Sequence, residues 1–240
     1  MVGTSKWARE RWSLEAEVLD LPLAERFTIA RDSWDSTQNV FVTLRFAGVS
    51  GIGESCPAAR WGEDPAAVVA ALEGVDPERL DNPFNLEGAL DLLPAGSARA
   101  ALDIALHDLA AKIAGLPLCK LLGSKGRPLP LTSVTVPIAP LDRMRERARG
   151  LADHPVLKVK VGFDGDVECV AAIRDVYAGA LRIDANEGWD ADKAIVRLKE
   201  LERFDIELCE QPIPAGDHDA LRKVTETTSI PVFADEDVCT

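Results

Sequence analysis

The sequence lacks any long apolar run. No apolar stretch approaches the 18 residues of a membrane-spanning helix. The N-terminal segment MVGTSKWARERWSLEAE carries too many charges for the core of a signal peptide. We therefore expect a cytoplasmic protein with no membrane partner.

Positive charge is scarce. Lysine and arginine number 27 against 40 aspartates and glutamates, a formal net charge of -13. A surface of this sign repels phosphate backbones, so nucleic acid is not an expected partner. A dispersed acidic surface accounts for most of this charge, and a part is expected where a cation binds.

Paired cysteines are also lacking. The five cysteines are an odd number, widely spaced, with no CxxC pair and no histidine at metal-ligand spacing from them: Cys56, Cys119, Cys169, Cys209 and Cys239. This pattern argues against a thiolate metal site and favours reduced thiols in the cytosol. An apolar fraction of 47% fits a soluble globular protein.

The N-terminal half predicts a small α+β domain. Residues 13–19 and 39–46 largely alternate apolar and polar side chains, which indicates strands. Residues 22–34 and 48–64 contain proline, glycine and serine and are predicted to be exposed loops. Residues 97–122 predict an amphipathic helix with a break near 115–117. We place this domain at residues 1–125.

Residues 126–240 have a different pattern of apolar and charged residues. Short apolar runs alternate with charged helical stretches, and the runs are LTSVTV, VLKVKVG, LRIDAN, IELCEQP and PVFADE. Strict alternation of strand and helix predicts βαβ units and a parallel sheet. We expect the first five strands of a TIM-type (β/α)8 barrel.

One polar residue recurs near the end of each predicted strand. These residues follow one another at intervals of 24 to 26 and are Thr135, Lys160, Asp184, Glu210 and Asp235. This interval matches one strand, two short loops and one helix, so all five are expected at the same level. In a (β/α)8 barrel that level is the C-terminal face, where active sites are built.

Three of these residues predict a magnesium site. Asp184, Glu210 and Asp235 are expected to converge from neighbouring strands, and three such charges repel one another. A divalent cation removes the conflict, and ligation by oxygen alone suits Mg²⁺. Any one of them alone would more simply be an ordinary surface carboxylate.

The two lysines of the second strand predict a general base. Lys158 and Lys160 are two residues apart, so their side chains point the same way. Two adjacent ammonium groups next to a divalent cation disfavour each other's charge, which should depress the lysine pKa towards the range of a useful general base. The chemistry this serves is proton abstraction alpha to a carboxylate, through an enediolate that the metal stabilises. Lys160 is the better candidate because it lies nearer the strand end.

The motifs LKVKVG, RIDANEGW, ELCEQP and PVFADE, together with ARAALDIALHDLAAKIAGLPLCKLLG, resemble the signatures of the enolase superfamily in its muconate-lactonizing subgroup. Within that subgroup the sequence most resembles dipeptide epimerases, such as those acting on L-Ala-D/L-Glu. The resemblance implies a capping domain before the barrel and an Mg²⁺-dependent epimerase that moves the alpha proton of a small dipeptide.

The resemblance also implies substrate-binding residues. Thr135 would face the substrate from the first barrel strand. Asn186, on the same strand face as Asp184, would support the residues that hold the metal. Arg31 falls in a capping loop where some epimerases have an arginine that could hold a side-chain carboxylate; a solvated loop cation is the equal alternative. The family usually has serine where this sequence has Asp237, which adds a charge near the metal.

The sequence stops directly after the fifth predicted strand, before the strand that carries the family's opposite acid/base lysine. We expect the N-terminal part of a longer polypeptide. A cycloisomerase or dehydratase of the same subgroup, such as muconate cycloisomerase or o-succinylbenzoate synthase, stays open as an alternative. So does an inactive fragment with a binding or structural role. The sequence leaves homo-oligomerisation undecided.

Overall fold

The computed structural model describes residues 10–124, 126 and 128–238. The chain divides into two compact units. The first comprises Met1–Pro22 and Ser36–Pro128, and the second Leu23–Asp35 and Leu129–Thr240. None of the helices in the described ranges is long and apolar enough to cross a membrane.

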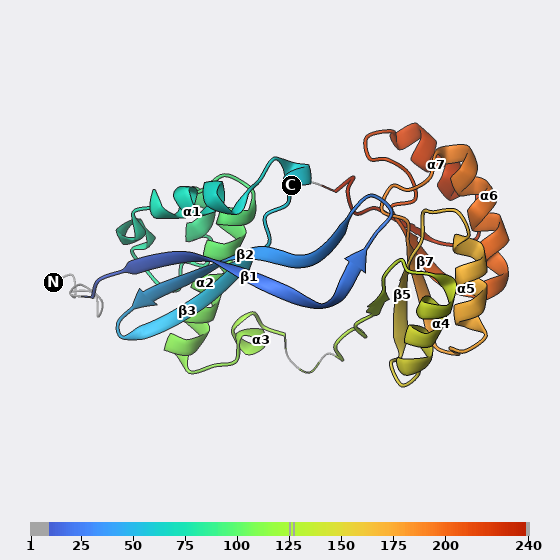
Figure 1. Cartoon of the computed structure of the whole chain (residues 1–240). Helices are drawn as coiled ribbons and strands as arrows, with labels where there is room; N and C mark the ends of the chain where they lie inside the picture. The colour runs from blue at the N-terminus through green and yellow to red at the C-terminus, as the bar shows by residue number, and fades with distance from the viewer. Residues whose placement is uncertain (1–9, 125, 127, 239–240) are drawn as a thin grey trace. The chain divides into compact units, whose positions relative to one another are not determined.

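The first unit contains a three-stranded sheet in the order β1-β2-β3. The strands are β1 (Ser13–Thr28), β2 (Ser33–Phe46) and β3 (Val49–Ser55), and β2 pairs antiparallel with β3. Figure 1 shows β1 and β2 as one long hairpin. The helices are α1 (Pro65–Glu73), α2 (Ser97–Ala114) and α3 (Leu118–Leu121), with single turns η1 (Ala59–Trp61), η2 (Pro77–Leu80) and η3 (Gly88–Asp91).

The core of this unit follows from two periodicities. Every second residue of β2 from Val40 to Phe46 is buried, and these side chains form one cluster with the apolar stripe of α2. The predicted helix over residues 97–122 is confirmed, including its break. Gly115 ends α2 in the left-handed conformation with φ of 65°, and α3 begins after Pro117.

Both predicted loops in this half are wrong in part. Residues 22–28 continue β1, and β2 begins at Ser33, so only residues 29–32 form the turn. This stretch of β1 has no buried face that would produce an alternating pattern. Within residues 48–64, the sequence did not predict β3, because the glycines of this strand are typical of a loop. A Cβ on Gly53 would run into the carbonyl oxygen of Ala101 in α2, so glycine serves close packing here.

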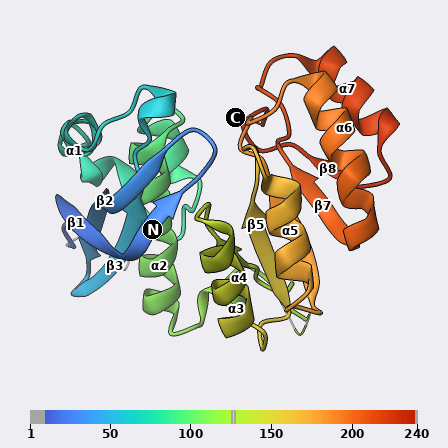
Figure 2. The same cartoon turned by 45° about the vertical axis from the view of Figure 1, so that its right-hand side comes forward.

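The second unit contains a parallel sheet of five strands in the order β4-β5-β6-β7-β8. The strands are β4 (Val134–Val136), β5 (Val156–Lys160), β6 (Ala180–Asp184), β7 (Ile206–Glu210) and β8 (Val232–Phe233). Between them lie α4 (Leu141–Gly150), α5 (Asp166–Arg174), α6 (Ala191–Leu201), the single turn η4 (Glu202–Phe204) and α7 (His218–Thr227). Figure 2 shows the helices packed along the strands. The predicted capping unit and five barrel strands are confirmed.

Alternation within each strand separates core from site. On β5 the apolar residues Leu157 and Val159 are fully buried and join one cluster with α5 and α6, whereas Lys158 and Lys160 are on the other face. The same cluster contains Leu181 and Ile183 of β6. The helices therefore cover the apolar face of the sheet, and the two lysines lie on the opposite face, towards the end of β5.

Close packing of β3 on α2 can be tested with Gly53→Ala. We expect the free energy of unfolding to fall by about 1–3 kcal/mol, because the added methyl group forces the strand and helix apart. Gly74→Ala is the matched control: Gly74 has φ of -74°, and its added Cβ would meet nearby atoms only at 3.5 Å. Urea denaturation followed by circular dichroism measures both. Equal stability of the two variants would contradict this account of β3.

Candidate active site at the strand ends

Three of the predicted residues end neighbouring strands at one level. Lys160 of β5 pairs in register with Asp184 of β6, which pairs with Glu210 of β7. Thr135 lies two residues lower, since it pairs with Lys158. Asp235 lies two residues beyond Phe233, the partner of Glu210. The expected single level thus holds for three residues of the five.

Both lysines face the same side, as predicted. The Lys160 ammonium group donates hydrogen bonds to Asp184 Oδ2 at 2.6 Å and to Asn186 Oδ1 at 2.8 Å. Lys158 contacts the same Asp184 oxygen at 2.9 Å and Glu210 at 2.8 Å. The side chain of Asp184 is 1% exposed and that of Lys160 is 9% exposed. One buried carboxylate therefore holds two ammonium groups.

The expected depression of the lysine pKa does not occur at Lys158. Burial opposes its charge, but hydrogen bonds and charge attraction from Glu210 and Asp184 outweigh burial, and the pKa of Lys158 is raised. The prediction considered the neighbouring ammonium group and a divalent cation. It omitted the contacts of Lys158 with Asp184 at 2.9 Å and Glu210 at 2.8 Å.

The two carboxylates of this cluster respond in opposite directions. Burial favours the neutral form of Asp184, yet the charges and hydrogen bonds of Lys160 and Lys158 prevail and its pKa is lowered. The pKa of Glu210 is raised by burial and by the negative charges of Asp184 and Asp235, against the hydrogen bond from Lys158. Burial is the largest of these effects on Glu210, and the negative charges of Asp184 and Asp235 add to it.

The carboxylates expected to bind metal do not form a ready ligand cluster. Across residues 10–124, 126 and 128–238, no group of three or more histidine, cysteine, aspartate or glutamate side chains could hold a metal ion. Lys158 lies between Asp184 and Glu210, and Asp235 is exposed beyond β8. Their chemistry nevertheless suits Mg²⁺, because all donors are carboxylate oxygens and a cation would oppose the burial and the nearby negative charges that raise the pKa of Glu210.

Arg31 and Asn186 lie beside this cluster. Arg31, in the turn between β1 and β2, donates to the backbone oxygen of Asn186 at 3.0 Å and contacts Glu236 at 2.7 Å and Glu187 at 3.4 Å. The predicted capping loop is therefore the tip of a hairpin, and its arginine is bound to protein carboxylates. Thr135 is half-buried on β4, and its backbone oxygen accepts from Arg147.

Two buried polar residues were missed by the sequence analysis. Glu236 follows Asp235 directly in ADED, and Gln211 follows Glu210; both are buried. The amide oxygen of Gln211 accepts the backbone N–H groups of Asp235 and Asp237 at 2.9 and 3.2 Å, so it fixes the segment after β8. The signal that could have found them is their position next to the predicted carboxylates.

The unusual Asp237 has its own partners. It accepts hydrogen bonds from the Gln211 side chain and the Gly216 backbone, both at 2.7 Å, and lies 3.4 Å from His218. Burial opposes its charge, but these hydrogen bonds outweigh it and the pKa of Asp237 is lowered. Its charge is thus balanced by groups other than Lys158 and Lys160.

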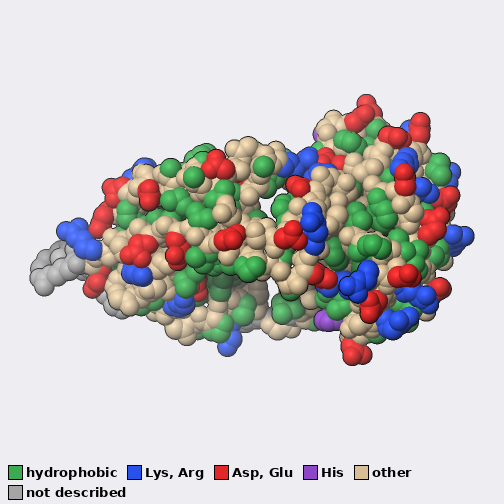
Figure 3. Space-filling model, in the orientation of Figure 1, with side chains coloured by type: hydrophobic (Ala, Val, Ile, Leu, Met, Phe, Trp, Pro, Cys, Tyr) green, Lys and Arg blue, Asp and Glu red, His purple; other side chains and the backbone are tan. Residues whose placement is uncertain are grey.

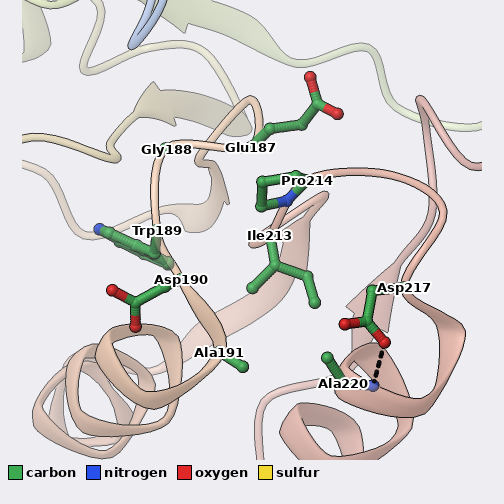
Figure 4. Close-up of a pocket in the computed structure, with 9 residues that line it drawn as sticks. All are labelled: Glu187, Gly188, Trp189, Asp190, Ala191, Ile213, Pro214, Asp217 and Ala220. Atoms are coloured by element: carbon green, nitrogen blue, oxygen red, sulfur yellow. Dashed lines mark hydrogen bonds between the residues drawn. The ribbon is translucent and has the colours of Figure 1, made fainter.

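A pocket of about 430 Å³ lies next to this region, between the loops that follow β6 and β7. Figure 4 shows Trp189 and Ile213 in its wall and Asp190 and Asp217 at the starts of α6 and α7. Lys160, Asp184 and Glu210 are not among its lining residues. In Figure 3 acidic and basic side chains are interspersed on the face shown. The strand-end cluster, rather than this pocket, is the candidate site.

The fold and the site define a class: a capping domain joined to barrel strands whose ends carry lysines and carboxylates. Residues 13–123 match the family model "Mandelate racemase / muconate lactonizing enzyme, N-terminal domain", and residues 142–240 match "Enolase C-terminal domain-like". The chain belongs to the enolase superfamily, in its mandelate racemase and muconate lactonizing enzyme group.

Its relatives include dipeptide epimerases. The chain is 36% identical to the L-Ala-D/L-Glu epimerase of Bacteroides thetaiotaomicron, over 90% of this chain and 58% of that protein. It is 38% identical to the L-Ala-D/L-Glu epimerase of Escherichia coli, over 90% of this chain and 67% of that protein. A solved dipeptide epimerase from Cytophaga hutchinsonii, complexed with Mg and D-Ala-L-Val, has a TM-score of 0.84 and 31% identity, covering 96% of this chain and 66% of that one. The chain thus spans about three fifths to two thirds of these relatives.

Asp184→Asn tests the role of the shared carboxylate. Removing this buried negative charge leaves the ammonium groups of Lys158 and Lys160 without their shared carboxylate. We therefore expect the free energy of unfolding at pH 7 to fall by about 3 kcal/mol. The folded pKa of Asp184 lies below its unfolded value of about 3.9, so its stabilisation is present above that pH and is lost as the pH falls through the folded pKa. The difference between variant and wild type should therefore shrink below about pH 4.

Glu210→Gln is the matched comparison, measured by urea unfolding in metal-free buffer. Because the raised pKa of Glu210 shows that its charge is disfavoured, this change should alter stability by less than about 1 kcal/mol. If Glu210→Gln loses more unfolding free energy than Asp184→Asn, then Glu210, not Asp184, is the carboxylate that stabilises the two lysines.

Proposed function

We propose that the protein is a magnesium-dependent epimerase that moves the alpha proton of a dipeptide from one face to the other. The observation that carries this proposal is Lys160, a nearly buried lysine at a strand end between Asp184 and Asn186. Similarity to dipeptide epimerases across 90% of the chain supports it.

In this proposal Lys160 acts on one face of the alpha carbon. Its neutral amine takes the alpha proton, and the resulting ammonium group is stabilised by the hydrogen bonds it donates to Asp184 and Asn186. Lys158 keeps a positive charge beside it, because its pKa is raised by two carboxylates. A second acid–base group is required on the opposite face, and we assign none among the residues of this chain.

The metal would be held by Asp184, Glu210 and Asp235. When bound, Mg²⁺ would supply positive charge against the negative charge that develops on the substrate carboxylate. For Asp184 and Glu210 to become ligands, Lys158 must give up at least part of its contact with them, since its ammonium group lies between them. We expect Lys158 and the ion to compete for the same oxygens.

Substrate contacts are assigned to Thr135, Arg31 and Asn186. Asn186 is buried and its side chain lies against Lys160, so it is adjacent to the reacting centre in this proposal. Arg31 already contacts Glu236 and Glu187, and a substrate carboxylate would have to compete with both. The partner is a small molecule, a dipeptide or a related carboxylate.

Proton exchange in D₂O tests the reaction. With Mg²⁺ and a panel of L-Ala dipeptides, the protein should introduce deuterium at the alpha carbon, detected by ¹H NMR. Lys160→Ala should abolish exchange of the proton on its face while the fold remains intact. Lys199→Ala, at an exposed position of α6, is the control and should exchange normally. A folded wild type that exchanges no dipeptide in the presence of Mg²⁺ would exclude epimerisation by this chain.

Metal binding can be measured separately from activity. We expect Mg²⁺ to raise the thermal unfolding midpoint of the wild type, since a ligand at 100 times its Kd adds about 2.7 kcal/mol. Asp184→Asn and Asp235→Asn should lose this shift. Asp192→Asn removes an exposed carboxylate paired with Lys223 and should keep it. Retention of the full shift in Asp235→Asn would remove that residue from the proposed ligand set.

A further inference from the structure

Arg31 connects two strand ends of the second unit through a single nitrogen. Its Nη1 atom is 2.7 Å from Glu236 Oε1, 3.0 Å from the Asn186 backbone oxygen and 3.4 Å from Glu187 Oε2. Asn186 and Glu187 follow β6, and Glu236 follows β8. The tip of the hairpin is thus bound to the residues around Lys160.

Glu236 is the most buried partner of this arginine. Its side chain is 3% exposed, compared with 10% for Glu187 and 36% for Arg31. A carboxylate with so little access to water requires a cation or hydrogen-bond donors. Glu236 finds both, because its Oε1 atom contacts Arg31 and also lies 3.5 Å from the side-chain nitrogen of Asn186.

The side-chain amide of Asn186 is held in one orientation by its two neighbours. The Lys160 ammonium group can only donate, so it requires the amide oxygen, at 2.8 Å. The Glu236 carboxylate can only accept, so it requires the amide nitrogen. The backbone of Asn186 is also constrained: its φ is 43°, and its N–H group donates to Asp184 Oδ1 at 2.9 Å. Glu236 is therefore linked to Lys160 through a single intervening side chain, that of Asn186.

The hairpin tip has further contacts with the same strand ends. The Thr28 backbone oxygen accepts from Ile138 at 2.9 Å, just after β4. Gly162, just after β5, has φ of 93°, and a Cβ there would be 3.0 Å from the Ala30 Cβ. These contacts place the tip against the loops after β4 and β5, and Arg31 extends it to those after β6 and β8.

We propose that Glu236 and Arg31 are positioning residues for Lys160. Glu236 fixes the amide of Asn186, which in turn holds the Lys160 ammonium group, and Arg31 neutralises Glu236 while tying the hairpin tip to the same network. The importance of this network for catalysis rests on the proposed role of Lys160. The physical coupling between the tip and Lys160 is independent of that role.

The test compares Glu236→Gln and Arg31→Lys with the wild-type chain. Glu236→Gln keeps the shape and removes the obligate acceptor, while Arg31→Lys keeps the charge but not the reach to all three oxygens. Glu207→Gln is the control, since it breaks a more exposed ion pair of similar length, with Arg182 on the neighbouring strand. Two readouts need no activity: deuterium uptake by residues 23–35, and labelling of Lys160 by an N-hydroxysuccinimide ester at one fixed pH, both measured by mass spectrometry.

We expect Glu236→Gln to increase both rates about tenfold, the factor that corresponds to the loss of one charge-assisted hydrogen bond. Arg31→Lys should give a smaller increase in both, and Glu207→Gln none. If Glu236→Gln does not fold, Arg31→Lys and Glu236→Asp carry the test. Wild-type rates in a folded Glu236→Gln, or faster uptake at the tip with unchanged labelling of Lys160, would overturn the proposal.

Catalysis supplies a third readout if the wild type exchanges the alpha proton. Glu236→Gln should then lower kcat about tenfold and leave KM within about twofold, because a misplaced base affects the chemical step. An effect on KM alone would overturn the positioning role. A wild type without exchange would count against the proposed epimerase function alone, since the uptake and labelling measurements stand without it.

Discussion

The candidate site depends on one buried oxygen atom. Oδ2 of Asp184 accepts from Lys160 and contacts Lys158, and both lysines come from the neighbouring strand β5. Two ammonium groups on one strand face would repel each other strongly without a carboxylate between them. A carboxylate that is 1% exposed in turn requires these partners, the two lysines at Oδ2 and the Asn186 N–H group at Oδ1. The register of β5 and β6, which places Lys160 directly beside Asp184, is what permits this mutual dependence.

Much of this arrangement was predictable from the sequence. The interval of 24 to 26 residues predicted five parallel strands and brought Lys160, Asp184 and Glu210 to one level, because each βα unit consumes a similar length of chain. It could not locate Thr135 and Asp235, since a regular interval does not fix the register of each strand pair: Thr135 pairs with Lys158, and Asp235 lies two residues beyond the partner of Glu210.

Other features depend on contacts between distant residues. The continuation of β1 to Thr28 carries no apolar alternation, and the glycines of β3 resemble those of a loop until the approach of α2 explains them. The raised pKa of Lys158 follows from carboxylates on two other strands. Glu236 has no distinguishing signal in the sequence, and its buried carboxylate is bound by Arg31, which lies far from it along the chain. Side-chain partners of this kind are set by packing, which periodicity does not encode.

The hairpin of β1 and β2 takes part in both units, with residues 23–35 assigned to the second. The barrel unit is consequently discontinuous in sequence: Arg31 is synthesised 155 residues before Asn186, the residue whose backbone it binds. During translation the hairpin tip emerges before the strands that it binds have been synthesised. Contacts between residues so far apart in sequence form late and slowly in folding. It also follows that a gene fragment beginning at residue 129 would encode the strands without the arginine that joins two of their ends. Any dissection of this protein into separately expressed domains has to keep residues 23–35 with the barrel strands.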